Sequence, residues 1–258
     1  MSTTAGVVTA TPGNQHRAST TSPIADPLPI AFGVFAFTLA VFGVRYVGVS
    51  ASSLNGPTSA ALDYAILIGG IAEIIGGVLA VIRGVGYSGW VSSIFGIWLV
   101  GFFLLIGHND PAAASDSGIV TTGADGKALA DSVTSTLQTV NTAAWHASSV
   151  AWYALVLFIP VLLLAIPAVL GRNIPFIVAF VAVLGMIVLF GSAYLGVYST
   201  LTDVTRGRAT EPDLSTPVDL LRVSGYLAFV AAAAIWWVFL RTVLEAHRAD
   251  ARAHAALG

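Results

Sequence analysis

Apolar residues in this chain gather in long runs that are separated by polar segments. The runs occupy residues 30–49, 62–82, 90–106, 150–170, 174–197 and 223–240. An α-helix rises 1.5 Å per residue, so about 20 residues cross the hydrocarbon core of a bilayer. Six such runs in one short chain are more typical of membrane spans than of buried helices in a large soluble protein. The pattern therefore predicts an all-α fold, a polytopic membrane protein whose residues 26–240 form a bundle of six transmembrane helices.

The segments between the runs alternate in length. Residues 83–89 and 171–173 are short turns, whereas residues 107–149 and 198–221 form two long polar loops. With six spans, both termini and both short turns lie on one side of the membrane. Arginines occur in both short turns and in the C-terminal tail, and short cytoplasmic loops are enriched in basic residues. We therefore expect a multi-pass protein of the cell (inner) membrane, with both termini in the cytoplasm and the long loops outside.

The two ends of the chain differ in composition from the runs between them. Residues 1–25 are polar and rich in Ser and Thr, without the apolar segment of a cleavable signal peptide, so we expect a disordered cytoplasmic tail. Residues 240–256 contain strong helix formers and neither Gly nor Pro, so residues 241–258 should form a cytoplasmic helical extension. Within the first long loop, residues 126–144 could form a short amphipathic helix.

The composition supports the membrane assignment and narrows the function. Of 258 residues, 56% are hydrophobic and 9% are charged, whereas a soluble domain carries about 25% charged residues. The net charge of -2 offers no basic field for a nucleic acid, and the absence of cysteine excludes disulfides and thiolate metal sites. The histidines show no metal-binding spacing, and no nucleotide-binding or hydrolase motif is present. We therefore expect no metal, no cofactor and no enzymatic activity, and the lipid bilayer as the main partner.

Glu73 is the one acidic residue in the middle of an apolar run. Burying a charge in hydrocarbon is costly, so an ionisable residue at such a position needs compensation. Glycines flank it in two pairs, Gly69 with Gly76 and Gly70 with Gly77, which predicts a small-residue face for close helix packing. Glu73 borders this face and should point into protein. It is either a proton-linked or gating group in a pathway, or a protonated carboxyl group hydrogen-bonded to a neighbouring helix.

The start and the end of the first run carry further polar residues. Asp26-Pro27-Leu28-Pro29 precedes the run, where proline suits the first helical turn and Asp26 could cap it. The free N–H groups of such a helix start also attract carboxylates. Arg45 lies near the outer end, and we expect it to extend to the membrane interface. The alternative is that Arg45 attracts an anion at the mouth of a pathway.

Small and aromatic side chains are the remaining pore-lining candidates, because polar residues are scarce in the runs. An aromatic residue in a span more often serves packing than gating, so none of these is assigned from its type alone. The candidates are Thr38, Ser92, Ser93 and Trp98.

Three stretches in the first half of the chain carry a family resemblance. Asp26–Phe35 resembles the N-P-x-P-x-G-L-x-x-F start of the first helix in the acetate uptake transporter family (YaaH-type, the succinate–acetate permeases). Residues 69–77, with the basic turn at Gly84, resemble the G-G-x-A-Q/E second helix of that family. Residues 87–98 are similar to its F-G-x-T-x-F-x-S-Y-G-x-F-W segment. The chain therefore resembles a divergent member of this family.

The resemblance implies six-helix subunits that assemble as homo-hexamers, with a pathway for acetate and related small carboxylates through each subunit. It also implies a hydrophobic constriction midway along that pathway. The implied constriction residues are Phe35, Phe95 and an aliphatic residue of the fifth helix near Leu184. The implied pathway entrance consists of Asp26, Pro27 and Pro29.

Several residues depart from the family pattern. Asp26 stands where the family has asparagine, Phe95 stands where it has tyrosine, and the first long loop is longer. These departures concern the substrate more than the fold. We expect a membrane transporter or channel for acetate and similar small monocarboxylates, either proton-coupled or passive. The alternatives are a non-transporting membrane scaffold subunit and a pathway for an uncharged small solute such as ammonia.

Overall fold

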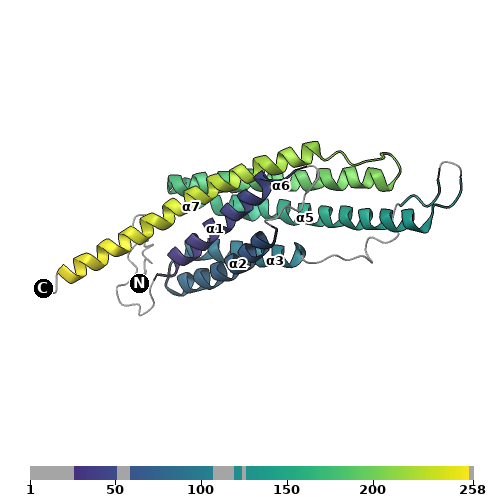
Figure 1. The fold of residues 1–258 in the computed structure, drawn as a ribbon. Coiled ribbons are helices and arrows are strands. Elements are labelled where there is room, and N and C mark those ends of the chain that lie inside the picture. The colour runs from purple at the N-terminus through teal and green to yellow at the C-terminus, as the bar shows by residue number, and fades with distance from the viewer. Residues whose placement is uncertain (1–25, 51–58, 107–118, 124–125, 256–258) are drawn as a thin grey trace, which may run out of the picture.

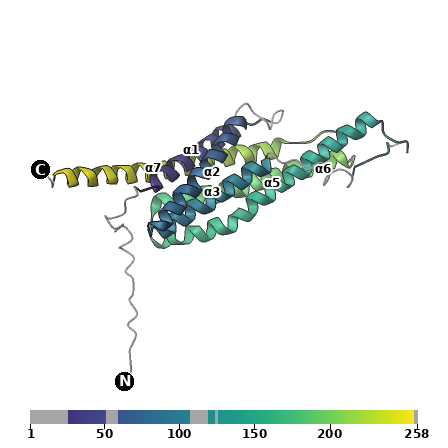
Figure 2. The ribbon, with the colours of Figure 1, turned by 90° about the horizontal axis from the view of Figure 1, so that it is seen from below.

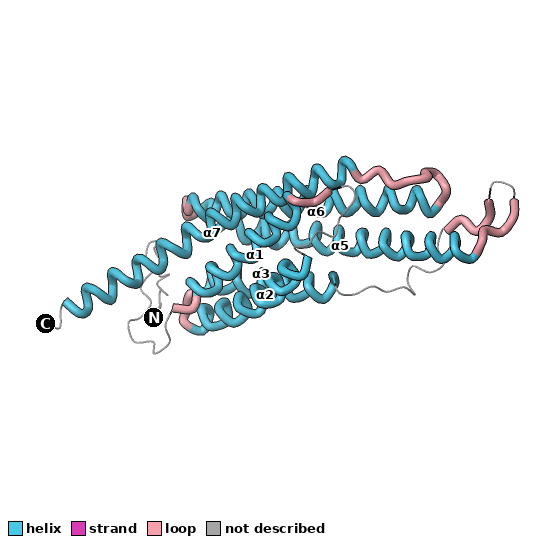
Figure 3. Tube along the Cα trace, in the orientation of Figure 1, coloured by secondary structure: helices cyan, strands magenta, loops and turns pink. Residues whose placement is uncertain are grey.

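The structure is a computed structural model that describes residues 26–50, 59–106, 119–123 and 126–255. The expected N-terminal tail, residues 1–25, lies outside the described residues. The described part is mainly helical (Figure 3), and an isolated antiparallel bridge pairs Thr122 with Ala128. Its helices are α1 (Leu28–Val47), α2 (Ser59–Ile82), α3 (Gly86–Ile106), α5 (Asp131–Leu170), α6 (Ile174–Thr205) and α7 (Ser215–Ala255).

All six helices are long and apolar enough to cross a membrane. They confirm the predicted fold class, an all-α polytopic bundle. In the membrane a helix bonds all of its backbone N–H and C=O groups within one segment, which is why apolar runs of this length fold as helices. Large apolar side chains are exposed on every helix of the bundle, as lipid or a neighbouring protein requires.

The helices form a closed ring in which chain neighbours pack side by side. The ring runs from α1 through α2, α3, α5, α6 and α7 back to α1, and contacts are sparsest between α3 and α5. Aromatic side chains bridge this sparse seam. The Tyr87 hydroxyl donates to the carbonyl oxygen of Leu164 at 2.6 Å, and the Tyr153 hydroxyl donates to that of Trp98 at 3.0 Å.

The bundle has two ends of different construction. At the short-turn end lie the start of α1, the end of α7 and the turns at residues 83–85 and 171–173, as the even number of spans requires (Figure 1). The opposite, long-loop end carries the connections after α1, α3 and α6. The C-terminal part of α7 projects beyond the bundle at the short-turn end in both ribbon views (Figure 2).

The helices α5, α6 and α7 extend well beyond the apolar runs that predict them. α5 has 40 residues and begins at Asp131 rather than near residue 150, so it absorbs much of the polar segment 107–149. At 1.5 Å per residue it is about 60 Å long, twice the thickness of the hydrocarbon core. α6 extends to Thr205, and the outer parts of α5 and α6 meet where Trp145 packs edge-on against Tyr198.

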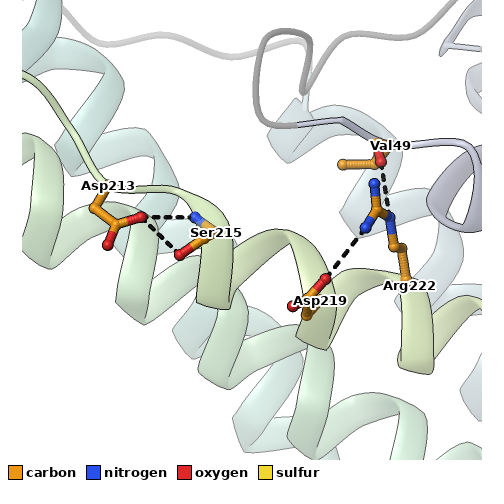
Figure 4. Close-up of polar contacts among 5 residues, drawn as sticks. All are labelled: Val49, Asp213, Ser215, Asp219 and Arg222. Carbon is orange, nitrogen blue, oxygen red and sulfur yellow. Dashed lines mark hydrogen bonds and ion pairs between the residues drawn. The ribbon is translucent and has the colours of Figure 1, made fainter.

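Hydrogen bonds at the long-loop end stabilise the start of α7 and connect this helix to Val49, just after the end of α1 (Figure 4). The Asp213 carboxylate accepts from the backbone N–H and the hydroxyl of Ser215, the first residue of α7, and these bonds lower the pKa of Asp213. Two turns further on, Arg222 donates from Nε to the carbonyl oxygen of Val49 at 3.1 Å. Its other nitrogen pairs with Asp219 at 3.2 Å.

Arg45 differs from its expected placement at the membrane interface. Its side chain is only 6% exposed, and the guanidinium lies 5.7 Å from the centre of the Tyr46 ring. It also interacts electrostatically with Asp63 of α2. The Tyr46 ring and the Asp63 carboxylate both attract the guanidinium, which favours this inward direction over the interface. Its alternative role, attracting an anion at a pathway mouth, stays a prediction.

The glycines around Glu73 let α2 approach two helices at once. A Cβ atom on Gly76 would lie 2.9 Å from the Cβ of Ala31 on α1, and a Cβ on Gly69 would collide with the Thr38 hydroxyl. On the other side, a Cβ on Gly70 would lie 2.9 Å from the carbonyl oxygen of Gly96 on α3. One glycine pair therefore serves α1 and the other serves α3, and Glu73 lies between the two contacts.

Replacing Gly96 with alanine should loosen the α2–α3 contact. The added Cβ would lie 2.6 Å from the carbonyl oxygen of Gly70. Because the atom it meets belongs to the backbone, the clash cannot be relieved by rotating a side chain. We expect the free energy of unfolding to fall by about 1–3 kcal/mol, measured as a lower melting temperature in mild detergent.

Gly86→Ala is the matched control, since its new Cβ would meet no atom closer than 3.7 Å. Equal melting temperatures for the two variants would contradict the packing account.

Candidate functional site

Two cavities lie one above the other inside the ring, between α1, α3 and α6. Cavity 1 is nearer the short-turn end. It is lined by Phe32, Phe35, Glu73, Val91, Ser92, Phe95, Phe176, Ala179, Phe180, Val183 and Ile235. Cavity 2 is nearer the long-loop end. It is lined by Phe35, Thr38, Leu39, Phe42, Ile66, Phe95, Trp98, Leu99, Phe102, Leu157, Val183 and Met186.

The boundary between the cavities consists of the three residues that line both, Phe35, Phe95 and Val183. The two phenylalanine rings lie 5.0 Å apart, centre to centre, and are tilted by 40°. All three side chains are buried, and they come from α1, α3 and α6. These helices start at the same end of the bundle, so side chains a similar distance along each one meet at one level.

The boundary can be compared with the constriction that the family resemblance implies. The structure brings Phe35 and Phe95 together, and their role in a constriction stays a prediction. Leu184 is half-buried and is not among the lining residues, whereas its neighbour Val183 lines both cavities. A shift of one position turns a helical side chain by about 100°, so a register error of one residue moves the third member off the boundary.

Polar groups are few in the two cavities. Glu73 and Ser92 lie in the wall of cavity 1, and each is 1% exposed. Thr38 lies in the wall of cavity 2, where its hydroxyl is 3.1 Å from the carbonyl oxygen of Val34 and 3.0 Å from that of Ala65. The Thr38 hydroxyl therefore links α1 to α2.

The other predicted pore-lining residues differ in their positions. Trp98 lines cavity 2, where its ring stacks on Phe102 at 5.1 Å and its Nε1 donates to the carbonyl oxygen of Tyr153 at 3.5 Å. Ser93 lies instead at the α2–α3 contact, where its hydroxyl faces Gly77. The structure thus brings Trp98 to the cavity and leaves Ser93 in a helix seam.

The predicted entrance residues lie at the start of α1. The exposed Asp26 accepts a hydrogen bond from the backbone N–H of Leu28 at 3.1 Å, although the N-cap position itself is occupied by Pro27. Pro27 is buried, and its carbonyl oxygen faces Gly76 of α2. Pro29 occupies the first turn, where its missing N–H leaves no donor unpaired.

Sequence reasoning missed the aromatic residues that α6 supplies. Phe176 and Phe180 line cavity 1, and the Phe176 ring packs edge-on against Phe32 of α1 at 5.6 Å. Further along, Phe190 packs against Phe42 at 5.3 Å. The spacing of four between Phe176 and Phe180 places both on one helix face, which is the signal that could have identified this wall.

The comparisons with known proteins bear on the fold. No family model matches the chain, and no curated protein matches it in sequence. The solved structure of the bacterial acetate channel SatP matches with a TM-score of 0.55 at 13% sequence identity. The alignment covers 87% of this chain and 94% of the SatP chain. This chain therefore has a SatP-like fold over nearly its whole length.

The Thr38 hydroxyl offers a test of how α1 and α2 are joined in the cavity wall. Thr38→Val keeps the shape of the side chain and removes the bond to Ala65. We expect a loss of about 0.6–1.7 kcal/mol in stability, the range for one hydrogen bond between membrane helices, read as a lower melting temperature in detergent.

Thr136→Val is the control, because the exposed Thr136 hydroxyl bonds only to Ser132 of its own helix. A Thr38→Val protein as stable as this control would show that the interhelical bond contributes nothing.

Proposed function

We propose that this protein is a membrane channel or transporter for acetate and similar small monocarboxylates. The pathway runs along the ring axis from cavity 1, past Phe35, Phe95 and Val183, to cavity 2. The observation that carries the proposal is the alignment of two apolar cavities at a shared aromatic boundary. It is supported by the fold, which is similar to that of a bacterial acetate channel.

The chemistry of the cavity walls suits a small, partly apolar solute. Ligand sites are typically concave and mostly apolar, with few polar groups that fix orientation. Aromatic side chains dominate both walls, so a methyl or ethyl group would contact them favourably. A short apolar boundary limits the distance over which a polar head group loses its hydration, which is how hydrophobic constrictions gate small solutes.

In this proposal the third residue of the boundary is Val183, and not Leu184. The entrance lies at the start of α1, at Asp26, Pro27 and Pro29, which is the end of the bundle nearer cavity 1. By resemblance to the permeases, we further propose a homo-hexamer in the cell membrane with both termini in the cytoplasm. Mass measurement of the protein purified in mild detergent tests this assembly, and a stoichiometric foreign partner would instead favour the scaffold alternative.

Flux through reconstituted liposomes tests the proposed function. We expect labelled acetate to enter vesicles that contain the protein faster than it enters protein-free vesicles, between about pH 5 and 7, where acetate is mainly an anion. The absence of flux above that of protein-free vesicles over this range would contradict the proposal.

Val183→Phe locates the pathway. The larger side chain fills the boundary, and we expect acetate flux to fall about tenfold while the protein remains folded. Val188→Phe, which lies on the same helix and is 40% exposed at the outer surface of the bundle, serves as the matched control. Equal flux through both variants would place the pathway elsewhere.

The apolar lining of cavity 2 also favours a second candidate, an uncharged solute such as ammonia. The same vesicles distinguish the two, because ammonia entry raises the internal pH after an ammonium jump. If the internal pH rises, the Val183→Phe substitution slows that rise, and no acetate enters, the result would support this alternative.

A further inference from the structure

Two buried oxygen atoms in the wall of cavity 1 have no hydrogen-bond partner in the part of the chain that the structure describes. They are Oε2 of Glu73 and Oγ of Ser92. Both side chains are 1% exposed, and both line the same cavity from adjacent helices, α2 and α3. Buried polar atoms are nearly always hydrogen-bonded, so two unpartnered oxygen atoms on residues that line one cavity suggest a bound molecule there.

We infer that Glu73 and Ser92 together bind the carboxyl group of a small monocarboxylic acid inside cavity 1. This inference rests on the proposed function and assigns it a binding site. A carboxylate carries two acceptor oxygens on one carbon, and it is satisfied by two donors from one side of a cavity. The Ser92 hydroxyl is one donor. Glu73 supplies the other when its carboxyl group holds a proton.

The surroundings of Glu73 favour that protonated form. α1, α3, α6 and α7 line the cavity with aromatic, aliphatic and Ser92 side chains, and none of these lining residues is charged or titratable. An ionised carboxylate in such a wall would have no cation to compensate its lost hydration. A neutral Glu73 avoids that cost, and its O–H then faces the cavity occupant as a charge-assisted donor.

The same wall selects the rest of the ligand. Phe32, Phe176 and Phe180 line the same cavity as the polar pair, and their rings offer contact to a short alkyl group. A second carboxylate on the ligand would have to be buried against these rings without a partner. The site therefore accepts monocarboxylic acids with short apolar tails and excludes dicarboxylates.

The site has a defined response to pH. While Glu73 holds its proton, it donates to the bound carboxylate and the two groups share one negative charge. When Glu73 loses its proton at higher pH, two like charges meet in an apolar cavity and binding weakens. Acetate affinity should therefore decrease as pH rises through the range in which Glu73 ionises. Glu73→Gln keeps an N–H donor without a titrating proton, so its acetate affinity should not change with pH.

Infrared difference spectroscopy on the purified full-length protein tests the contact directly. Adding acetate should shift the C=O stretch of a protonated carboxyl group, and the shifted band should be absent from Glu73→Gln. Isotope-labelled acetate separates the ligand's own bands from those of the protein. Glu245→Gln is the matched control, since Glu245 is exposed and pairs with Arg241 at 3.5 Å. A wild-type spectrum that acetate leaves unchanged would overturn the inference and leave water as the occupant.

Transport kinetics supply the second test. We expect Ser92→Ala to raise the half-saturating acetate concentration about tenfold, as the loss of one hydrogen bond to a charged group does. Ser149→Ala, on the exposed part of α5, should leave it unchanged. If wild-type vesicles show no acetate flux, the proposed function fails. If they show flux but the Glu73→Gln and Ser92→Ala proteins keep wild-type affinity and pH dependence, this inference alone fails.

Discussion

Close contact between helix backbones is the constraint on which the rest of this structure depends. In a bilayer, apolar side chains gain little by leaving lipid, so helices associate through packing and a few hydrogen bonds. Glycines on α2 permit this packing on two sides, with Gly69 and Gly76 against α1 and Gly70 and Gly77 against α3. The three helices are thereby held at a distance that bulkier residues would not allow.

This contact determines where Glu73 points. Because the glycine pairs use the two flanks of α2, the residue between them faces the junction of α1 and α3, which opens into cavity 1. Across the ring, α6 contributes larger aromatic residues that fill the interior and close its middle with Val183. Tight glycine packing on one side and aromatic packing on the other leave two small cavities rather than an open channel.

Much of the fold follows from the sequence, and part of the site does. Apolar length predicts six helices, because a bilayer admits few other structures, but it gives no signal for the helical part of 131–149, which is polar. The residues that interrupt the apolar pattern, Glu73 and the segment around Phe95, do line a cavity. Val183 and Phe176 are ordinary apolar residues of a long run, so only the rotation of α6 against its neighbours identifies them. Arg45 shows the same limit, since its inward direction depends on Tyr46 and Asp63 together.

The central claim is that one pathway crosses the bundle at the boundary between the two cavities. The chain contains no cysteine, so a single introduced cysteine reports its own accessibility. A small membrane-impermeant thiol reagent should label Ala179→Cys, in cavity 1, from the short-turn side only. It should label Thr38→Cys, in cavity 2, from the long-loop side only, and acetate should slow both reactions. Labelling of both positions from the same side, without protection by acetate, would contradict the claim.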